Sequence, residues 1–107
     1  MSLSIFFLNV LIFLPLGSQP QNSLSFSGKS LFMDNCSVCH RNGQNIILPE
    51  KNLQLKTLKL NGMNTSKSIV YQIVNGKNGM PAFGGRLNEK DIEKITEYIL
   101  RESDSIF

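Results

Sequence analysis

The stretch Cys36-Ser37-Val38-Cys39-His40 decides how the rest of the chain is read. Two cysteines three positions apart, with a histidine directly after them, have the spacing that attaches a c-type haem. In such a motif the thiols add to the two haem vinyl groups, and the turn presents the histidine as the first axial ligand of the iron. The 107-residue chain has only two cysteines and one histidine, so this stretch holds all of its thiol and imidazole ligands. We therefore expect one haem c, bound covalently through two thioethers at Cys36 and Cys39 and ligated by His40.

Three other uses of the same residues have to be compared with haem attachment. A redox-active dithiol of the thioredoxin kind needs a βαβ pattern, and none is visible in the sequence. A structural zinc site usually needs four Cys or His ligands, and this chain supplies three. A structural disulfide between the two cysteines remains an alternative in an oxidising compartment.

The residues before the motif predict export. No charged side chain precedes Lys29, and residues 5–16 form a mostly apolar run. This run is too short to span a bilayer, which takes roughly 20 residues, and has the length of a signal-peptide core. We expect a signal peptide at 1–22, with cleavage between residues 17 and 25, and a single domain at 23–107. A retained membrane anchor is the alternative. Export suits a c-type haem, because its attachment takes place in a haem-loading compartment across a membrane.

The charge of the chain is mildly basic and forms no cluster of like charges. Eleven Lys and Arg side chains against eight Asp and Glu give a net charge of +3. Without a basic cluster we expect no nucleic-acid binding, and we expect no stable membrane insertion of the mature domain. A small positive charge can instead steer the protein toward a partner with an acidic docking patch.

The residues that follow read as helices, which predicts an all-α domain. Ser27, Thr65 or Ser66, and Asn88 are candidate N-caps, each followed by residues with helical spacing. The expected helices are about 27–35, a short and poorly periodic one near 53–60, one from 65 or 66 to 75, and a final one from 88. The loop from Arg41 to Lys51 should be irregular.

A thioether is the natural second axial ligand beside histidine in such a haem site. Met80 lies in a loop between two expected helices, among glycines that permit tight turns and next to the stiff Pro81. Met1 belongs to the export segment, and Met33 is too close to Cys36 to reach the opposite haem face. Met63, in an Asn-Gly-Met-Asn turn, remains the alternative to Met80.

A family resemblance rests on the stretch 71–87, which reads YQIVNGKNGMPAFGGRL. This stretch, together with residues 45–51 and 61–64, resembles cytochrome c6, a soluble electron carrier of cyanobacteria and algal plastids. The resemblance covers about residues 23–102. It implies a class I cytochrome c fold, with about four helices wrapped around one covalently bound haem.

The resemblance also implies roles for single residues around the haem. The Pro49 carbonyl would accept a hydrogen bond from Nδ1 of His40, which fixes the ring and raises its basicity. Gln72 matches a glutamine that tunes the reduction potential, and Arg86 matches an arginine used in partner docking.

Two residues of the first helix complete the resemblance. In the family's crossing of the terminal helices, Gly28 and Phe32 would pack against the last helix near Tyr98.

The implied function is one-electron transfer without enzymatic activity, because His40 and Met80 would fill both axial positions. The partners would be cytochrome f of the cytochrome b6f complex and photosystem I, in the thylakoid lumen of an algal plastid or a cyanobacterium. We expect a monomer. One alternative is a cytochrome c of the bacterial periplasm that donates electrons to a respiratory oxidase. A haem enzyme or gas sensor, which would need an open sixth site, is another.

Overall fold

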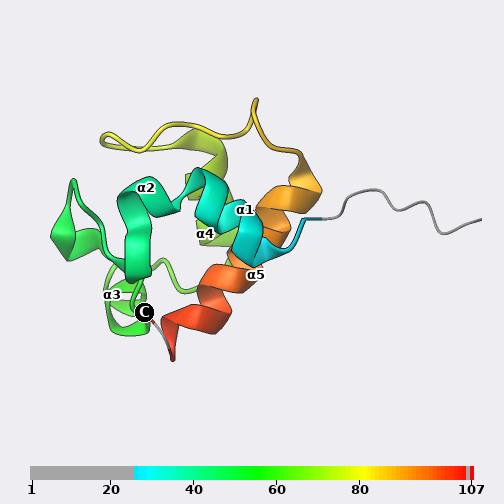
Figure 1. Cartoon of the computed structure of the whole chain (residues 1–107). Helices are drawn as coiled ribbons and strands as arrows, with labels where there is room; N and C mark the ends of the chain where they lie inside the picture. The colour runs from blue at the N-terminus through cyan, green and yellow to red at the C-terminus, as the bar shows by residue number, and fades with distance from the viewer. Residues whose placement is uncertain (1–25, 106) are drawn as a thin grey trace, which may run out of the picture.

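The structure, a computed structural model, describes residues 26–105 and 107. The predicted signal peptide lies outside the described residues. Within them the chain forms five α-helices and no strand, so the predicted all-α class is confirmed. The helices are α1 (Gly28–Asn35), α2 (Ser37–His40), α3 (Leu55–Leu60), α4 (Ser66–Asn75) and α5 (Glu89–Ser103) (Figure 1). Four of them match the expected helices, and the single turn α2 is the addition.

Three helices begin where a side chain accepts a hydrogen bond from the first turn. The Ser27 hydroxyl accepts one from Ser30 N, and the Thr65 hydroxyl accepts one from Ser68 N. The Asn88 side chain accepts one from Asp91 N at 2.8 Å. Each cap satisfies a backbone N–H that has no partner inside the helix. The predicted caps at Ser27 and Asn88 are confirmed, and Thr65 rather than Ser66 caps α4.

The first and last helices cross in close contact. A Cβ atom added at Gly28 would collide with the Lys94 carbonyl oxygen, so only glycine allows the two backbones this approach. One turn further on, the rings of Phe32 and Tyr98 lie with their centroids 5.2 Å apart. The predicted packing of Gly28 and Phe32 near Tyr98 is confirmed.

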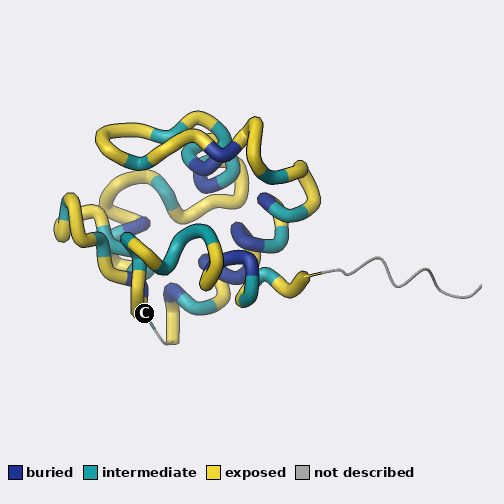
Figure 2. Tube along the Cα trace, turned by 45° about the horizontal axis from the view of Figure 1, so that its top comes forward, coloured by how far each residue is buried: buried dark blue, intermediate teal, exposed yellow. Residues whose placement is uncertain are grey.

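A single core joins α1, α3, α4 and α5. Its members are apolar side chains on the inner faces of the helices plus one from the loop after α4. They are Leu31, Phe32, Leu58, Ile69, Ile73, Phe83, Ile92, Ile95, Tyr98 and Ile99. Figure 2 shows these buried stretches inside a shell of exposed loops. Among the residues that the structure describes, no helix is long and apolar enough to span a bilayer.

Candidate haem site

A cavity of about 330 Å³ opens between α2, α3, α4 and the loop after α4. Its volume lies at the lower end of the range of about 300–1,000 Å³ typical of ligand pockets, and its lining is mostly apolar. The predicted site residues that line it are Cys36, Cys39, His40, Gln72 and Met80. The fold therefore brings the attachment motif together with residues of α4 and of the loop after it.

The helix turn α2 sets the spacing of the attachment motif. The Cys36 carbonyl accepts hydrogen bonds from Cys39 N at 3.2 Å and from His40 N at 2.9 Å. Residues three and four positions apart on a helix share a face. Both thiols and the imidazole consequently face the same cavity.

The thiol of Cys36 is partly buried beside that of Cys39. Burial, with a smaller contribution from the nearby Cys39, raises the pKa of the Cys36 thiol to about 11. The two cysteines are free thiols in the structure, and the described residues contain no group of three Cys, His, Asp or Glu side chains placed to hold a metal.

The imidazole of His40 is oriented by a neighbouring carbonyl. Nδ1 lies 2.9 Å from the Gln44 carbonyl oxygen, which can only accept, so Nδ1 is the protonated nitrogen. Burial lowers the pKa of His40, although the bond to Gln44 opposes this effect. A neutral ring with its proton on Nδ1 has its lone pair on Nε2, the atom that a metal would bind.

The predicted role of Pro49 differs from what the structure shows. Pro49 is exposed and does not line the cavity, and its carbonyl accepts a hydrogen bond from Asn52 Nδ2 at 3.3 Å. The 3-10 turn η1 (Arg41–Gly43) reverses the chain directly after His40, and Gln44 N donates to Arg41 O at 3.1 Å. This turn brings the Gln44 carbonyl, rather than that of Pro49, to the ring.

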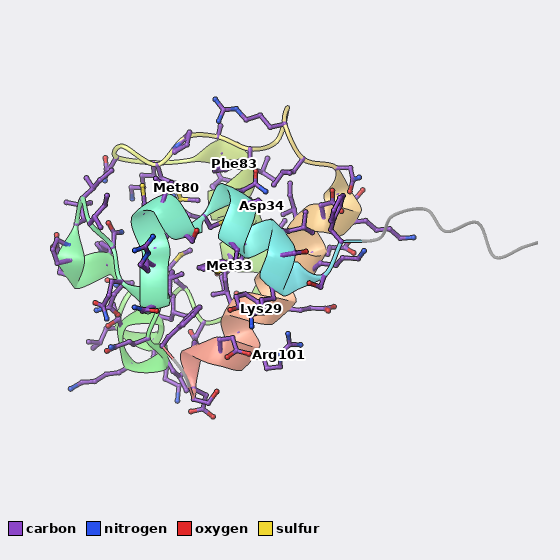
Figure 3. The ribbon with its side chains drawn as sticks, in the orientation of Figure 1. Lys29, Met33, Asp34, Met80, Phe83 and Arg101 are labelled. Carbon is purple, nitrogen blue, oxygen red and sulfur yellow. The ribbon has the colours of Figure 1, made fainter. Side chains whose placement is uncertain are left out.

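A short hairpin presents Met80. Lys77 and Met80 exchange two backbone hydrogen bonds of 3.1 and 3.0 Å around Asn78 and Gly79, which both have positive φ. Asn-Gly with positive φ at both positions is the preferred sequence of a tight two-residue hairpin. Phe83 N then donates to Ile73 O at 2.9 Å and ties the loop back to α4. Figure 3 shows Met80 on this loop.

Gln72 reaches the sulfur of Met80 from α4. Its Nε2 atom lies 3.8 Å from Met80 Sδ, within the range of a hydrogen bond to sulfur. The amide can thus orient the thioether and withdraw electron density from it. Met63 lines the same cavity, whereas Met33 is half exposed on α1 and does not.

Arg86 lies outside this cavity. It is exposed, with its guanidinium carbon 5.6 Å from the centroid of the Phe83 ring. This contact holds the arginine over the aromatic ring while leaving it open to solvent.

The sequence alone missed two parts of the site. The role of Gln44 carries no sequence signal, because it depends on a backbone carbonyl placed by η1. The hairpin could have been found, because Asn78-Gly79 between Lys77 and Met80 is a strong hairpin signal.

Comparison with known proteins places this site in a family. The family model described as "Cytochrome C oxidase, cbb3-type, subunit III" matches residues 26–99. Cytochrome c6 from Bumilleriopsis filiformis is 50% identical over 78 residues, covering 73% of this chain and 91% of the relative. Cytochrome c6 from Petalonia fascia is 53% identical over 77 residues, covering 72% of this chain and 91% of that relative. The crystal structure of cytochrome c6 from the diatom Phaeodactylum tricornutum superposes with a TM-score of 0.71 at 44% identity, covering 75% of this chain and 94% of that one.

The chain belongs to the cytochrome c6 family. Both the predicted resemblance and the class I cytochrome c fold are confirmed. Membership makes the chain a haem electron carrier and implies a haem c cofactor. The residues present fit that group, because the apolar cavity is lined by two free thiols, one imidazole and the thioethers of Met63 and Met80.

Proposed function

We propose that the chain binds one haem through thioethers at Cys36 and Cys39, with His40 and Met80 as axial ligands of its iron. The observation that supports this most strongly is that all four side chains line one apolar cavity. Gln72, at 3.8 Å from Met80 Sδ, then tunes the ligand. We further propose that the protein passes single electrons from cytochrome f of the cytochrome b6f complex to photosystem I.

In this proposal the haem supplies an iron centre that alternates between Fe(II) and Fe(III). Pairing a thioether with an imidazole raises the reduction potential of such a centre. With His40 and Met80 both ligating the iron, the site would offer no open position to a substrate, and the protein would act as a carrier rather than an enzyme. The apolar side chains that make up most of the cavity lining would shield the haem from water.

We place this carrier in the thylakoid lumen of an algal plastid or a cyanobacterium, with residues 1–22 removed as a signal peptide. The mature protein acts as a monomer that neither inserts stably into a membrane nor binds nucleic acid. Exposed Arg86 contributes to docking, which suits short-lived complexes guided by charge.

A haemochrome spectrum combined with an intact mass tests the cofactor. Protein from an export system with haem-attachment machinery should give the spectrum of a two-thioether haem and the mass of residues 23–107 plus one haem. The double variant Cys36→Ser/Cys39→Ser should lose covalent haem. A colourless wild-type protein with the mass of bare polypeptide would refute the proposal.

A second candidate is electron donation to a respiratory oxidase in a bacterial periplasm. The observation that favours it is the family model, whose description names an oxidase subunit. Flash-oxidised photosystem I distinguishes the two, because the first proposal requires that the reduced protein re-reduce it. Failure to do so, with intact haem and an unchanged visible spectrum, would leave the respiratory function. Carbon monoxide tests axial closure, since Met80 ligation predicts that the ferrous protein does not bind it at neutral pH.

A further inference from the structure

Phe107 packs into the place where the first and last helices cross. Its ring centroid lies 5.7 Å from that of Phe32 and 6.1 Å from that of Tyr98. Its backbone N–H donates to the Glu102 carbonyl at 3.1 Å, which turns the chain back toward α5. In Figure 1 this residue is the chain end marked C, which lies beside the end of α2. Phe107 is thus the third ring of an aromatic cluster.

The same side chain also covers the turn that follows His40. Gly43 in η1 is buried and has a φ of 73°. A Cβ atom added there would collide with Cβ and Cγ of Phe107. Phe107 therefore lies directly on the backbone of η1, a contact that needs glycine at position 43 both for its conformation and for space.

Hydrogen bonds connect this turn to the proposed iron ligand. The Gly43 carbonyl accepts a bond from Leu53 N at 2.7 Å, and Gln44 N donates to Arg41 O at 3.1 Å. The next carbonyl, that of Gln44, faces Nδ1 of His40 at 2.9 Å. The turn thus lies between the Phe107 ring on one side and the His40 ring on the other.

We propose that Phe107 is a positioning residue for His40, holding η1 so that the Gln44 carbonyl keeps its hydrogen bond with Nδ1. The inference rests on the proposed function, since it assumes that His40 ligates the haem iron. A carbonyl at Nδ1 makes an imidazole ligand more basic, and a more basic ligand favours Fe(III). Phe107 therefore lowers the reduction potential without touching the haem ligands.

The test compares three variants of the haem-loaded full chain. Phe107→Ala removes the aromatic ring, whereas Phe107→Tyr keeps an aromatic ring at this position. Ile92→Ala is the matched control, because Ile92 is a buried core residue of α5 that does not line the cavity. The readouts are the midpoint potential, amide hydrogen exchange at Gln44 and Leu53, and the rate of tryptic cleavage after Arg41 relative to Arg86.

The proposal expects Phe107→Ala to shift the potential upward, to speed exchange at Gln44 and Leu53, and to raise cleavage after Arg41 severalfold relative to Arg86. Phe107→Tyr should keep the potential, the exchange rates and the cleavage ratio at their wild-type values. Ile92→Ala should lower stability while leaving the potential unchanged.

Two results would overturn the inference alone while haem is present. One is a Phe107→Ala protein with the wild-type potential and wild-type exchange at Leu53. The other is an equal shift of the potential in Ile92→Ala, which would make the effect one of general stability. A wild-type protein without covalent haem would refute the proposed function instead. Exchange and cleavage can still be measured on that protein, and unchanged values in Phe107→Ala would then refute the contact with the turn as well.

Discussion

Gln44 determines which nitrogen of His40 is available to a metal. The Gln44 carbonyl oxygen lies 2.9 Å from Nδ1 of His40. Because a backbone carbonyl can only accept a hydrogen bond, it holds the imidazole proton on Nδ1. Nε2 then keeps its lone pair, and burial favours the neutral ring by lowering the pKa of His40. The local backbone thus prepares the histidine for ligation.

Replacing Met80 tests the second proposed ligand. We expect Met80→Ala to keep the covalent haem, to lose the far-red sulfur-to-iron absorption band and to lower the reduction potential, because the thioether favours Fe(II). Met80 is partly buried, so the free energy of unfolding should fall by about 2 kcal/mol, the lower end for Met→Ala. Absorption spectra and urea unfolding measure these changes. Met63→Ala is the matched control and should keep the band; the opposite pattern would make Met63 the ligand.

Replacing Gln72 tests the tuning of that ligand. An N–H donor near Met80 Sδ draws electron density from sulfur, so Gln72→Leu should make the thioether a stronger donor and lower the potential. The expected shift is up to about 60 mV, since one hydrogen bond contributes about 0.5–1.5 kcal/mol and 1.4 kcal/mol corresponds to about 59 mV for one electron. Redox titration measures it. Gln54→Leu, at a glutamine outside the cavity lining, should leave the potential unchanged. Equal shifts in both variants would argue against a specific contact.

At the scale of elements, the end of α4 positions the Met80 hairpin. Gly76 has φ 66° and ψ 173°, a region that is essentially restricted to glycine. A Cβ atom added there would collide with the Met80 carbonyl oxygen and come 2.7 Å from the Pro81 carbonyl carbon. The exit from α4 and the position of Met80 are therefore coupled through one backbone position.

Two glycines with similar φ provide a matched test of this coupling. Gly62 has φ 64°, and an added Cβ would meet nothing within 4 Å. Gly62→Ala should thus cost about 1 kcal/mol of unfolding free energy, for the conformation alone. Gly76→Ala should cost about 3 kcal/mol, and it should weaken the far-red band by displacing Met80. Urea unfolding measures the two costs, and absorption spectra follow the far-red band. Similar costs in the two variants, with an intact far-red band in Gly76→Ala, would mean that the hairpin adapts to the added methyl group.

Across the whole molecule, the features that residue patterns alone predicted depend on neighbouring residues, whereas the packing of Gly28 and Phe32 near Tyr98 was predicted from the family resemblance. The caps at Ser27 and Asn88 are local hydrogen bonds, and the apolar stripes of α4 and α5 follow from helical spacing. The acceptor for His40 could not be predicted in this way. It depends on η1, where Asn42 has φ 55° and where Gly43 is covered by Phe107, far along the chain. Tertiary contacts of this kind leave no periodic signal.

The stability of the whole fold should depend on Tyr98 at high pH. Burial raises the pKa of this phenol, with a smaller effect of Glu102 in the same direction, above its ordinary value of 10.0. The unfolded chain then loses the phenol proton at lower pH than the folded protein does. The stability that the neutral Tyr98 phenol contributes is therefore fully present below about pH 10 and is lost as the pH rises through the pKa of the folded protein. Urea unfolding from pH 8 to 11 should show stability falling above pH 10 in the wild type and a shallower fall in Tyr98→Phe, which keeps the ring packed on Phe32. Parallel curves for the two proteins would assign the loss to other groups.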